Sequence, residues 1–97
     1  MALLKELELY LSKYGEVVKE KKISDFGIQR KFRYDYFLPK LQTAIEINGG
    51  SYIGGRHNFG EGYERDLMKF NLTMAIGLRL FQFTYSMLLR QEYKLFL

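Results

Sequence analysis

The sequence contains no cysteine, a single proline and a single histidine among its 97 residues. Without cysteine there are no disulfides, no thiol catalysis, no iron–sulfur clusters and no cysteine-ligated zinc, and one histidine cannot form a multi-histidine metal site. No apolar run approaches the roughly 18 to 20 residues of a membrane span. Residues 1–6 lack the basic start and the sustained apolar core of a signal peptide. We therefore expect a protein of a reducing cytoplasm with no membrane partner.

The composition is that of a globular domain with a local excess of positive charge. Hydrophobic residues make up 47% and charged residues 27%, which together with the length predicts one small domain over residues 1–97. The formal net charge is +4, and the segment from Lys19 to Arg33, with six cationic and two acidic residues, carries all of it. Such a strip favours a polyanionic partner, and a solvated surface is the alternative.

The first half of the chain predicts a helix and three strands, of which the last two form an antiparallel pair. Apolar residues three and four apart predict a helix over residues 4–18. Residues 23–37 are predicted as extended, with a turn or bulge at Asp25–Gly27. Aromatic residues at 32, 34 and 36 alternate there with charged ones and define a buried face. Thr43–Asn48 is the next strand, and the short connection through Pro39 predicts antiparallel pairing.

The second half predicts a loop, a helix, a strand and a last helix. Six of the nine glycines fall between Gly49 and Gly62, which predicts a glycine-rich loop over residues 49–60. The helix over residues 61–76 has an apolar stripe at positions 63, 67, 70 and 74. Residues 78–84 form an apolar run typical of a central strand, and Ser86 is the predicted N-cap of a helix to about Phe96. The order of helix, three strands, helix, strand and helix predicts a compact α/β or α+β sandwich.

Two acidic residues, Asp35 and Glu46, lie in strands that otherwise have the composition of a core. Isolated carboxylates in such places are unfavourable unless they are paired or bound to a cation. If the two strands form a hairpin, both carboxylates and a backbone carbonyl such as that of Ile47 form an oxygen site that suits Mg²⁺ or Mn²⁺. In the structural alternative, Asp35 pairs with Arg33 or another basic residue and Glu46 pairs with Lys69.

Several segments, in the same order along the chain, resemble one family of enzymes. The segments are Arg30–Tyr36, Ala44–Gly50, Gly55–His57, Glu64–Asn71 and Gly77–Thr84. They resemble the PD-(D/E)XK nuclease superfamily, and within it the small phage and bacterial endonucleases similar to very-short-patch-repair endonucleases. The resemblance runs from about Gln29 to Thr84. It implies a restriction-endonuclease-like core of order αβββαβα, with a central mixed sheet flanked by helices, and DNA as the partner.

The resemblance also implies roles for individual residues. Asp35 is the first metal-ligating acid, and Glu46, with the carbonyl of Ile47, completes the Mg²⁺ or Mn²⁺ site. The sequence departs from the family at Asn48, where the superfamily usually has a lysine that positions or activates the attacking water. Either Lys69, reaching in from the following helix, or His57 takes over that task.

Further candidates surround this set of residues. Glu16 or Glu20, near the end of the first helix, is the possible accessory acid for the metal. Lys31, Arg33 and Arg56 are the expected phosphate contacts, together with Arg30 of the same strip. An alternative for each of these side chains is an ordinary solvated position.

Two other features bear on partners. The glycine pairs at 49–50 and 54–55 lack the lysine–serine/threonine ending of a P-loop, so no nucleotide cofactor is predicted. They are interpreted as a loop that brings Arg56 and His57 to a phosphodiester, or as a turn-rich connection. The apolar C-terminal segments Leu88–Leu89 and Leu95–Leu97 predict a homodimer interface.

Taken together, these patterns predict a metal-dependent DNA endonuclease. We expect in-line attack of a metal-activated water on a phosphodiester, with selectivity for DNA structure or with low sequence specificity. Repair, recombination or phage DNA processing, in bacterial or phage-infected host cytoplasm, is the expected context. One alternative, favoured by Asn48, is an inactive nucleic-acid-binding module of the same fold. Another is a protein-interaction domain of a phage particle.

Overall fold

The computed structural model describes residues 2–48 and 61–97 of the chain. Its helices are α1 (Ala2–Leu11), α2 (Glu61–Ala75) and α3 (Tyr85–Leu89), and its strands are β1 (Val18–Lys22), β2 (Arg33–Leu38), β3 (Thr43–Ile47) and β4 (Arg79–Phe83). Short 3₁₀ turns join several of them: η1 (Ser12–Tyr14), η2 (Ile23–Phe26), η3 (Pro39–Leu41) and η4 (Glu92–Leu95). The chain therefore forms a compact α+β domain.

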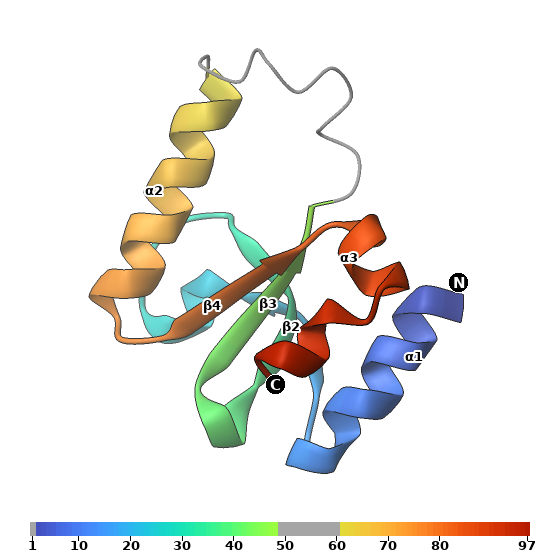
Figure 1. Cartoon of the computed structure of the whole chain (residues 1–97). Coiled ribbons are helices and arrows are strands. Elements are labelled where there is room, and N and C mark those ends of the chain that lie inside the picture. The colour runs from blue at the N-terminus through green and yellow to red at the C-terminus, as the bar shows by residue number, and fades with distance from the viewer. Residues whose placement is uncertain (1, 49–60) are drawn as a thin grey trace.

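The strands form one mixed sheet in the order β1-β2-β3-β4. β2 pairs antiparallel with β3, which confirms the predicted hairpin, and β1, which was not predicted, pairs antiparallel with β2. β3 and β4 are parallel, and parallel neighbours need a crossover connection, which contains α2. As Figure 1 shows, α2 covers one face of the sheet, whereas α1 and α3 lie on the other.

The end of the first helix differs from the prediction. α1 ends at Leu11, and Val18 belongs to β1 rather than to the helix. Gly15 lies between them with a φ of 92°, a conformation that glycine adopts at little cost and that a helix cannot contain. The start of the predicted extended segment is also different, because residues 23–26 form the 3₁₀ turn η2.

The last two elements also depart from the sequence pattern. β4 is an edge strand of the described sheet, not a central one. It is nevertheless apolar on both sides, since α2 packs on one of its faces and α3 lies on the other. Thr84, not Ser86, caps α3, because its hydroxyl accepts the Met87 N–H at 3.1 Å. The helix ends at Leu89 because Gln91 adopts a φ of 55°.

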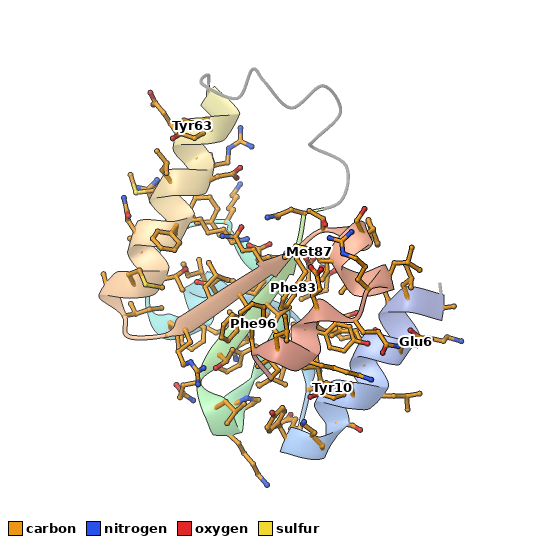
Figure 2. All side chains as sticks on the ribbon, viewed as in Figure 1. Glu6, Tyr10, Tyr63, Phe83, Met87 and Phe96 are labelled. Carbon is orange, nitrogen blue, oxygen red and sulfur yellow. The ribbon has the colours of Figure 1, made fainter. Side chains whose placement is uncertain are left out.

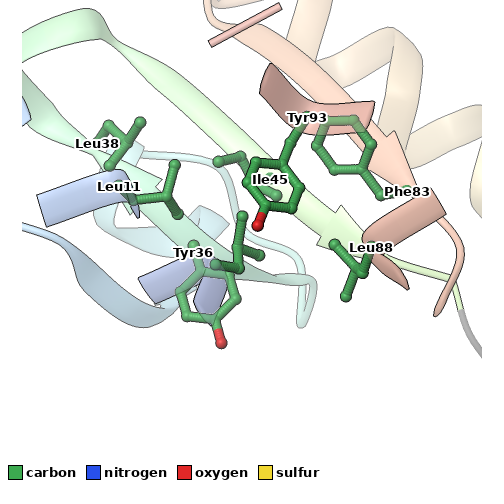
Figure 3. Packing of buried hydrophobic residues seen from close by; sticks show 8 residues of the cluster. Leu11, Tyr36, Leu38, Ile45, Phe83, Leu88 and Tyr93 are labelled. Carbon is green, nitrogen blue, oxygen red and sulfur yellow. The ribbon is translucent and has the colours of Figure 1, made fainter. Parts of the chain in front are cut away.

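Two hydrophobic clusters hold the layers together. The larger cluster lies between the sheet and the layer of α1, α3 and η4. Figure 3 shows how its labelled side chains pack together. Its buried residues are Leu7, Leu11, Tyr36, Leu38, Ile45, Phe83, Leu88 and Tyr93. The smaller cluster lies on the α2 side and contains Ile23, Tyr34, Phe37, Ala44 and Leu78. Leu88, expected at a surface, is therefore a core residue.

The two clusters divide the aromatic residues of β2 in a way the alternation did not predict. Tyr34 and Tyr36 are both buried, but they belong to different clusters, although residues two apart on a regular strand share a face. In the register between β1 and β2, Lys19 pairs with Tyr36 and Lys21 pairs with Tyr34. Glu20 and Asp35, which lie between these pairs, are not paired with each other. Glu20 has a φ of 55°, so the β1–β2 ladder is irregular at the level where β2 changes face.

The apolar stripe predicted for α2 does not face the sheet. Its members are substantially exposed: Tyr63 39%, Leu67 44%, Phe70 41% and Met74 43%. Figure 2 shows Tyr63 at the far end of α2, away from Phe83 and Phe96. The sheet-facing side instead carries Leu72, Thr73 and Ile76, with Lys69. This side is preferred because the sheet beneath presents the Glu46 carboxylate and the Tyr34 hydroxyl, which need polar partners.

Candidate functional site

Asp35 lies in β2, at the irregular point of the sheet, and it is only partly buried. Its carboxylate accepts the backbone N–H of Ile47 at 2.7 Å, at a position where a regular ladder would use a backbone carbonyl. The regular β2–β3 register starts at the next residue, Tyr36, which pairs with Ile45. Asp35 therefore contacts Ile47 through the N–H of that residue, not through the carbonyl that was predicted as a metal ligand.

Glu46 lies on β3, next to Ile47, and its partner comes from α2. Its carboxylate forms an ion pair with Lys69 of α2, and the two side chains are each only 15% exposed. Burial raises the pKa of Glu46 above its ordinary value, Lys69 acts in the opposite direction, and the negative charges of Asp35 and Asp66 add to the increase. The carboxylates of Asp35 and Glu46 are thus close enough to influence each other.

Lys69 is positioned by several groups at once. Its ammonium donates to the backbone carbonyl of Arg33 and lies 5.1 Å from the centre of the Tyr34 ring. One turn further along α2, the buried Thr73 hydroxyl is hydrogen bonded to the Tyr34 hydroxyl. These contacts fix the side of α2 that faces the sheet. They bring a lysine to the acidic site from outside the usual motif position.

The contacts of Glu46 and Lys69 fit both the structural interpretation and the nuclease interpretation of the sequence. The Glu46–Lys69 pair is the one expected by the structural alternative, and it is also the approach expected of a lysine that replaces the motif lysine. Within residues 2–48 and 61–97, Asp35 forms no ion pair with Arg33 or another basic residue, and Arg33 instead contacts Glu20 at 3.3 Å. Lys69 now supplies to Glu46 the positive charge that a bound cation would supply.

Asn48 occupies the position of the usual motif lysine but is engaged with β4. Its side-chain amide donates to the Gln82 side chain at 2.8 Å, and its backbone N–H donates to the Phe83 carbonyl at 2.8 Å. The backbone of Asn48 therefore extends the β3–β4 pairing by one residue, and the side-chain amide is hydrogen bonded to β4 as well. The amide carries no charge that would replace an ammonium.

A cavity of about 180 Å³ lies beside Asp35. Its lining residues are Leu4, Lys19, Glu20, Asp35, Tyr36, Ile47 and Tyr85. Glu20, one of the two possible accessory acids, thus opens on the same cavity as Asp35 and Ile47. Glu16, the other, is exposed and outside the lining. Glu46 is not part of the lining either, and its partner comes from α2 on the other face.

The donor chemistry of this region fits a hard divalent cation. Carboxylate and carbonyl oxygens are the ligands that Mg²⁺ and Mn²⁺ prefer, and Asp35, Glu20 and Ile47 all line one cavity, whereas Glu46 does not. Within residues 2–48 and 61–97, no group of three or more His, Cys, Asp or Glu side chains is placed to hold a metal ion. Backbone oxygen and water would therefore have to complete any coordination here.

The cationic strip lies on the surface next to the acidic residues. Arg30, Lys31 and Arg33 are exposed, and with Lys22, Ser24 and Phe32 they line a cavity of about 220 Å³. A second cavity shares Arg30 and Phe32 with the first and is also lined by Arg65 of α2, a residue that the sequence analysis missed because its neighbours in space are remote in the chain. Arg56 and His57 lie outside the described residues.

Among the described residues no helix combines the length and apolar character needed to cross a membrane. No protein-family model, no curated protein and no solved structure matches this chain. The feature of the chain that indicates a function is the arrangement of Asp35, Glu46 and Lys69 near the cationic strip.

Proposed function

We propose that this chain is a metal-dependent DNA endonuclease that uses Mg²⁺ or Mn²⁺ to hydrolyse phosphodiester bonds in the cytoplasm of a bacterium or of a phage-infected host. The observation that carries the proposal is the contact between Asp35 and the Ile47 backbone at 2.7 Å, with Glu46 adjacent to Ile47 on β3 and electrostatically coupled to Asp35. The two acids therefore lie on adjacent strands close to a strip of positive charge, with Asp35 beside the cavity and Glu46 turned toward Lys69 of α2.

The arrangement of elements supports the proposal. The sheet order β1-β2-β3-β4, antiparallel except for β3 and β4, with α2 in the crossover, agrees with the core that the family resemblance implies. In that core the two metal-binding acids lie on adjacent strands, as Asp35 and Glu46 do. The restriction-endonuclease-like assignment is part of this proposal.

Each residue has a defined task in the proposed reaction. Asp35, Glu46 and the Ile47 carbonyl hold the cation, and Glu20 is the accessory acid. When bound, a divalent cation lowers the pKa of a water and neutralises charge that develops on the phosphate. Lys69, or His57, orients the attacking water and offsets negative charge. Lys31, Arg33 and Arg56 hold the phosphates, with Arg30 beside them.

Cationic side chains on phosphates position DNA but do not read its sequence. We therefore propose selectivity for DNA structure, as required in repair, recombination or phage DNA processing, rather than for a base sequence. Affinity should fall steeply as salt concentration rises, because binding releases counterions from the DNA.

A cleavage assay on branched, nicked and linear DNA tests this function directly. We expect strand scission with Mg²⁺ or Mn²⁺ and none in EDTA, with the fastest cleavage on one of the branched or nicked substrates. Products resolved on denaturing gels give the measurement. Salt-sensitive binding without scission under any divalent metal would contradict the nuclease assignment.

A catalytically inactive nucleic-acid-binding module is the second candidate. The Asn48–Gln82 hydrogen bond favours it, because the position of the motif lysine holds an uncharged amide committed to β4. The Lys69–Glu46 ion pair favours it as well, since a purely structural partner already satisfies this carboxylate. Both candidates predict DNA binding, and only the nuclease predicts cleavage.

We also propose that the chain forms a homodimer through apolar surface at its C-terminal end. Leu89, Leu95 and Phe96 are 70%, 78% and 51% exposed, whereas Leu88 is buried and cannot contribute. Large apolar side chains that gather at the surface are typical of interaction sites. Sedimentation at micromolar concentration should show a dimer that Leu95→Ser shifts toward monomer; a monomeric parent protein would exclude this interface.

A further inference from the structure

Two cavities on the cationic side of the molecule share residues and form one groove. The first, of about 220 Å³, is lined by Lys22, Ser24, Arg30, Lys31, Phe32 and Arg33. The second, of about 400 Å³, is lined by Arg30, Phe32, Glu64, Arg65 and Met68. Arg30 and Phe32 belong to both. We propose that this groove binds a single-stranded segment of DNA, with phosphate in the first cavity and an unstacked base in the second; the proposal rests on the proposed function.

The first cavity has the chemistry of a phosphate site. Four of its lining residues are cationic, and a serine hydroxyl adds a neutral donor. Arg33 is partly neutralised by Glu20 at 3.3 Å, but Lys22, Arg30 and Lys31 form no ion pair with any carboxylate of the described residues. Such uncompensated charge around one concave surface attracts a phosphodiester.

The second cavity has the chemistry of a base site. Phe32 packs against the smaller core cluster and also lines the cavity, so that its ring is supported from behind. Met68, 41% exposed, adds a second apolar wall from α2. Aromatic rings and polarisable thioethers both stack on the face of a base. The Glu64 carboxylate and the Arg65 guanidinium supply an acceptor and donors for its polar edge.

The combination favours a single strand over a duplex. Cationic residues alone would hold either form, because both present phosphates. The apolar walls of Phe32 and Met68 become useful only when a base has left its stack, and in a duplex the bases are already stacked and paired. The groove also adjoins the acidic site, since the Arg33 carbonyl accepts from Lys69, which contacts Glu46. A strand bound here therefore leads toward the candidate catalytic residues.

Fluorescence anisotropy in EDTA separates this proposal from the nuclease activity. The full chain is titrated with a labelled mixed-sequence oligonucleotide, single-stranded or annealed to its complement. We expect the single strand to bind at least about five-fold more tightly, since an unpaired base can stack in the second cavity and a paired base cannot. Equal affinity for the two forms, or tighter duplex binding, overturns the proposal whether or not the protein cleaves DNA.

Substitutions in the groove test whether these residues cause the preference for single-stranded over duplex DNA. Arg65→Gln combined with Met68→Ser should remove most of the preference, and both side chains are exposed on α2, so the fold should persist. Lys5→Gln combined with Leu9→Ser is the matched control, because it removes one charge and one exposed apolar side chain from α1 on the other face. Phe32→Leu keeps apolar volume but removes the ring. It should also lower the preference, and circular dichroism verifies folding.

The outcomes are distinct. A loss of preference in the Arg65/Met68 and Phe32 variants, with the α1 control unchanged, supports the groove. An equal loss in the α1 control, or an unchanged preference in the groove variants, overturns it. Failure of the nuclease assignment would instead appear as absent cleavage while this binding preference persists.

Discussion

Asparagine in place of Asp35 is expected to reduce divalent-metal-dependent DNA cleavage by about a thousand-fold or more while leaving DNA binding nearly unchanged. The substitution removes one negative charge from the site that is to hold the cation. The amide oxygen of the new side chain keeps an acceptor for the Ile47 N–H, which the carboxylate now bonds at 2.7 Å. Metal ions provide several kcal/mol of transition-state stabilisation, and about 1.4 kcal/mol corresponds to a factor of ten in rate. Initial cleavage rates with Mg²⁺ or Mn²⁺ give the measurement.

Two further variants make this result interpretable. Glu46→Gln should have a similar effect on cleavage, since it removes the second acid. Asp25→Asn is the matched control, because it is the same chemical change at an exposed carboxylate that contacts Lys21 at 3.4 Å, in η2. Cleavage by the Asp35 variant at the rate of the parent would contradict the proposed metal site. An equal loss in the Asp25 variant would point to a general defect.

Alanine in place of Phe83 is expected to lower the free energy of unfolding by about 3–5 kcal/mol. Phe83 is 2% exposed, and its ring lies 6.4 Å from that of Tyr93 in an edge-to-face arrangement and 6.2 Å from that of Phe96. Loss of the ring leaves a cavity where the sheet meets α3 and η4. Small domains have only about 5–15 kcal/mol in total, so urea denaturation should show a much lower midpoint.

The corresponding change at Phe96 provides the comparison. Phe96→Ala removes the same side chain, but Phe96 is 51% exposed, and we expect a loss of about 1 kcal/mol. The two variants differ in burial rather than in chemistry. Equal losses at both positions would show that the larger cluster is packed differently from the arrangement in Figure 3.

Much of the secondary structure could be predicted because it depends on short-range patterns. α2 was expected over residues 61–76 and spans Glu61–Ala75, and β4 was expected over residues 78–84 and spans Arg79–Phe83. The antiparallel pairing of β2 with β3 also follows from their short connection. Where the pattern was ambiguous, as between Gly15 and Ile23, a strand replaced the end of the predicted helix, because pairing with β2 outweighs local propensity.

The candidate site was predictable only in part. Acidic residues in two adjacent strands were evident from the sequence, and the structure places Asp35 and Glu46 on such strands. The sequence could not decide which partner each carboxylate takes. Asp35 accepts from the backbone of Ile47, and Glu46 pairs with Lys69, which lies on a helix far along the chain. The sequence also could not predict that Arg65 lines the groove, because its position there depends on how α2 packs on the sheet.

Sequence patterns alone indicated a mixed α and β domain, the order of its main elements and the concentration of positive charge between Lys19 and Arg33. These properties follow from composition and from periodicities of a few residues, which act locally along the chain. Only the tertiary structure decided that α2 turns Lys69 and Thr73, rather than its apolar stripe, toward the sheet. That choice depends on the buried polar groups of distant strands, Glu46 and Tyr34, which must find partners once water is removed.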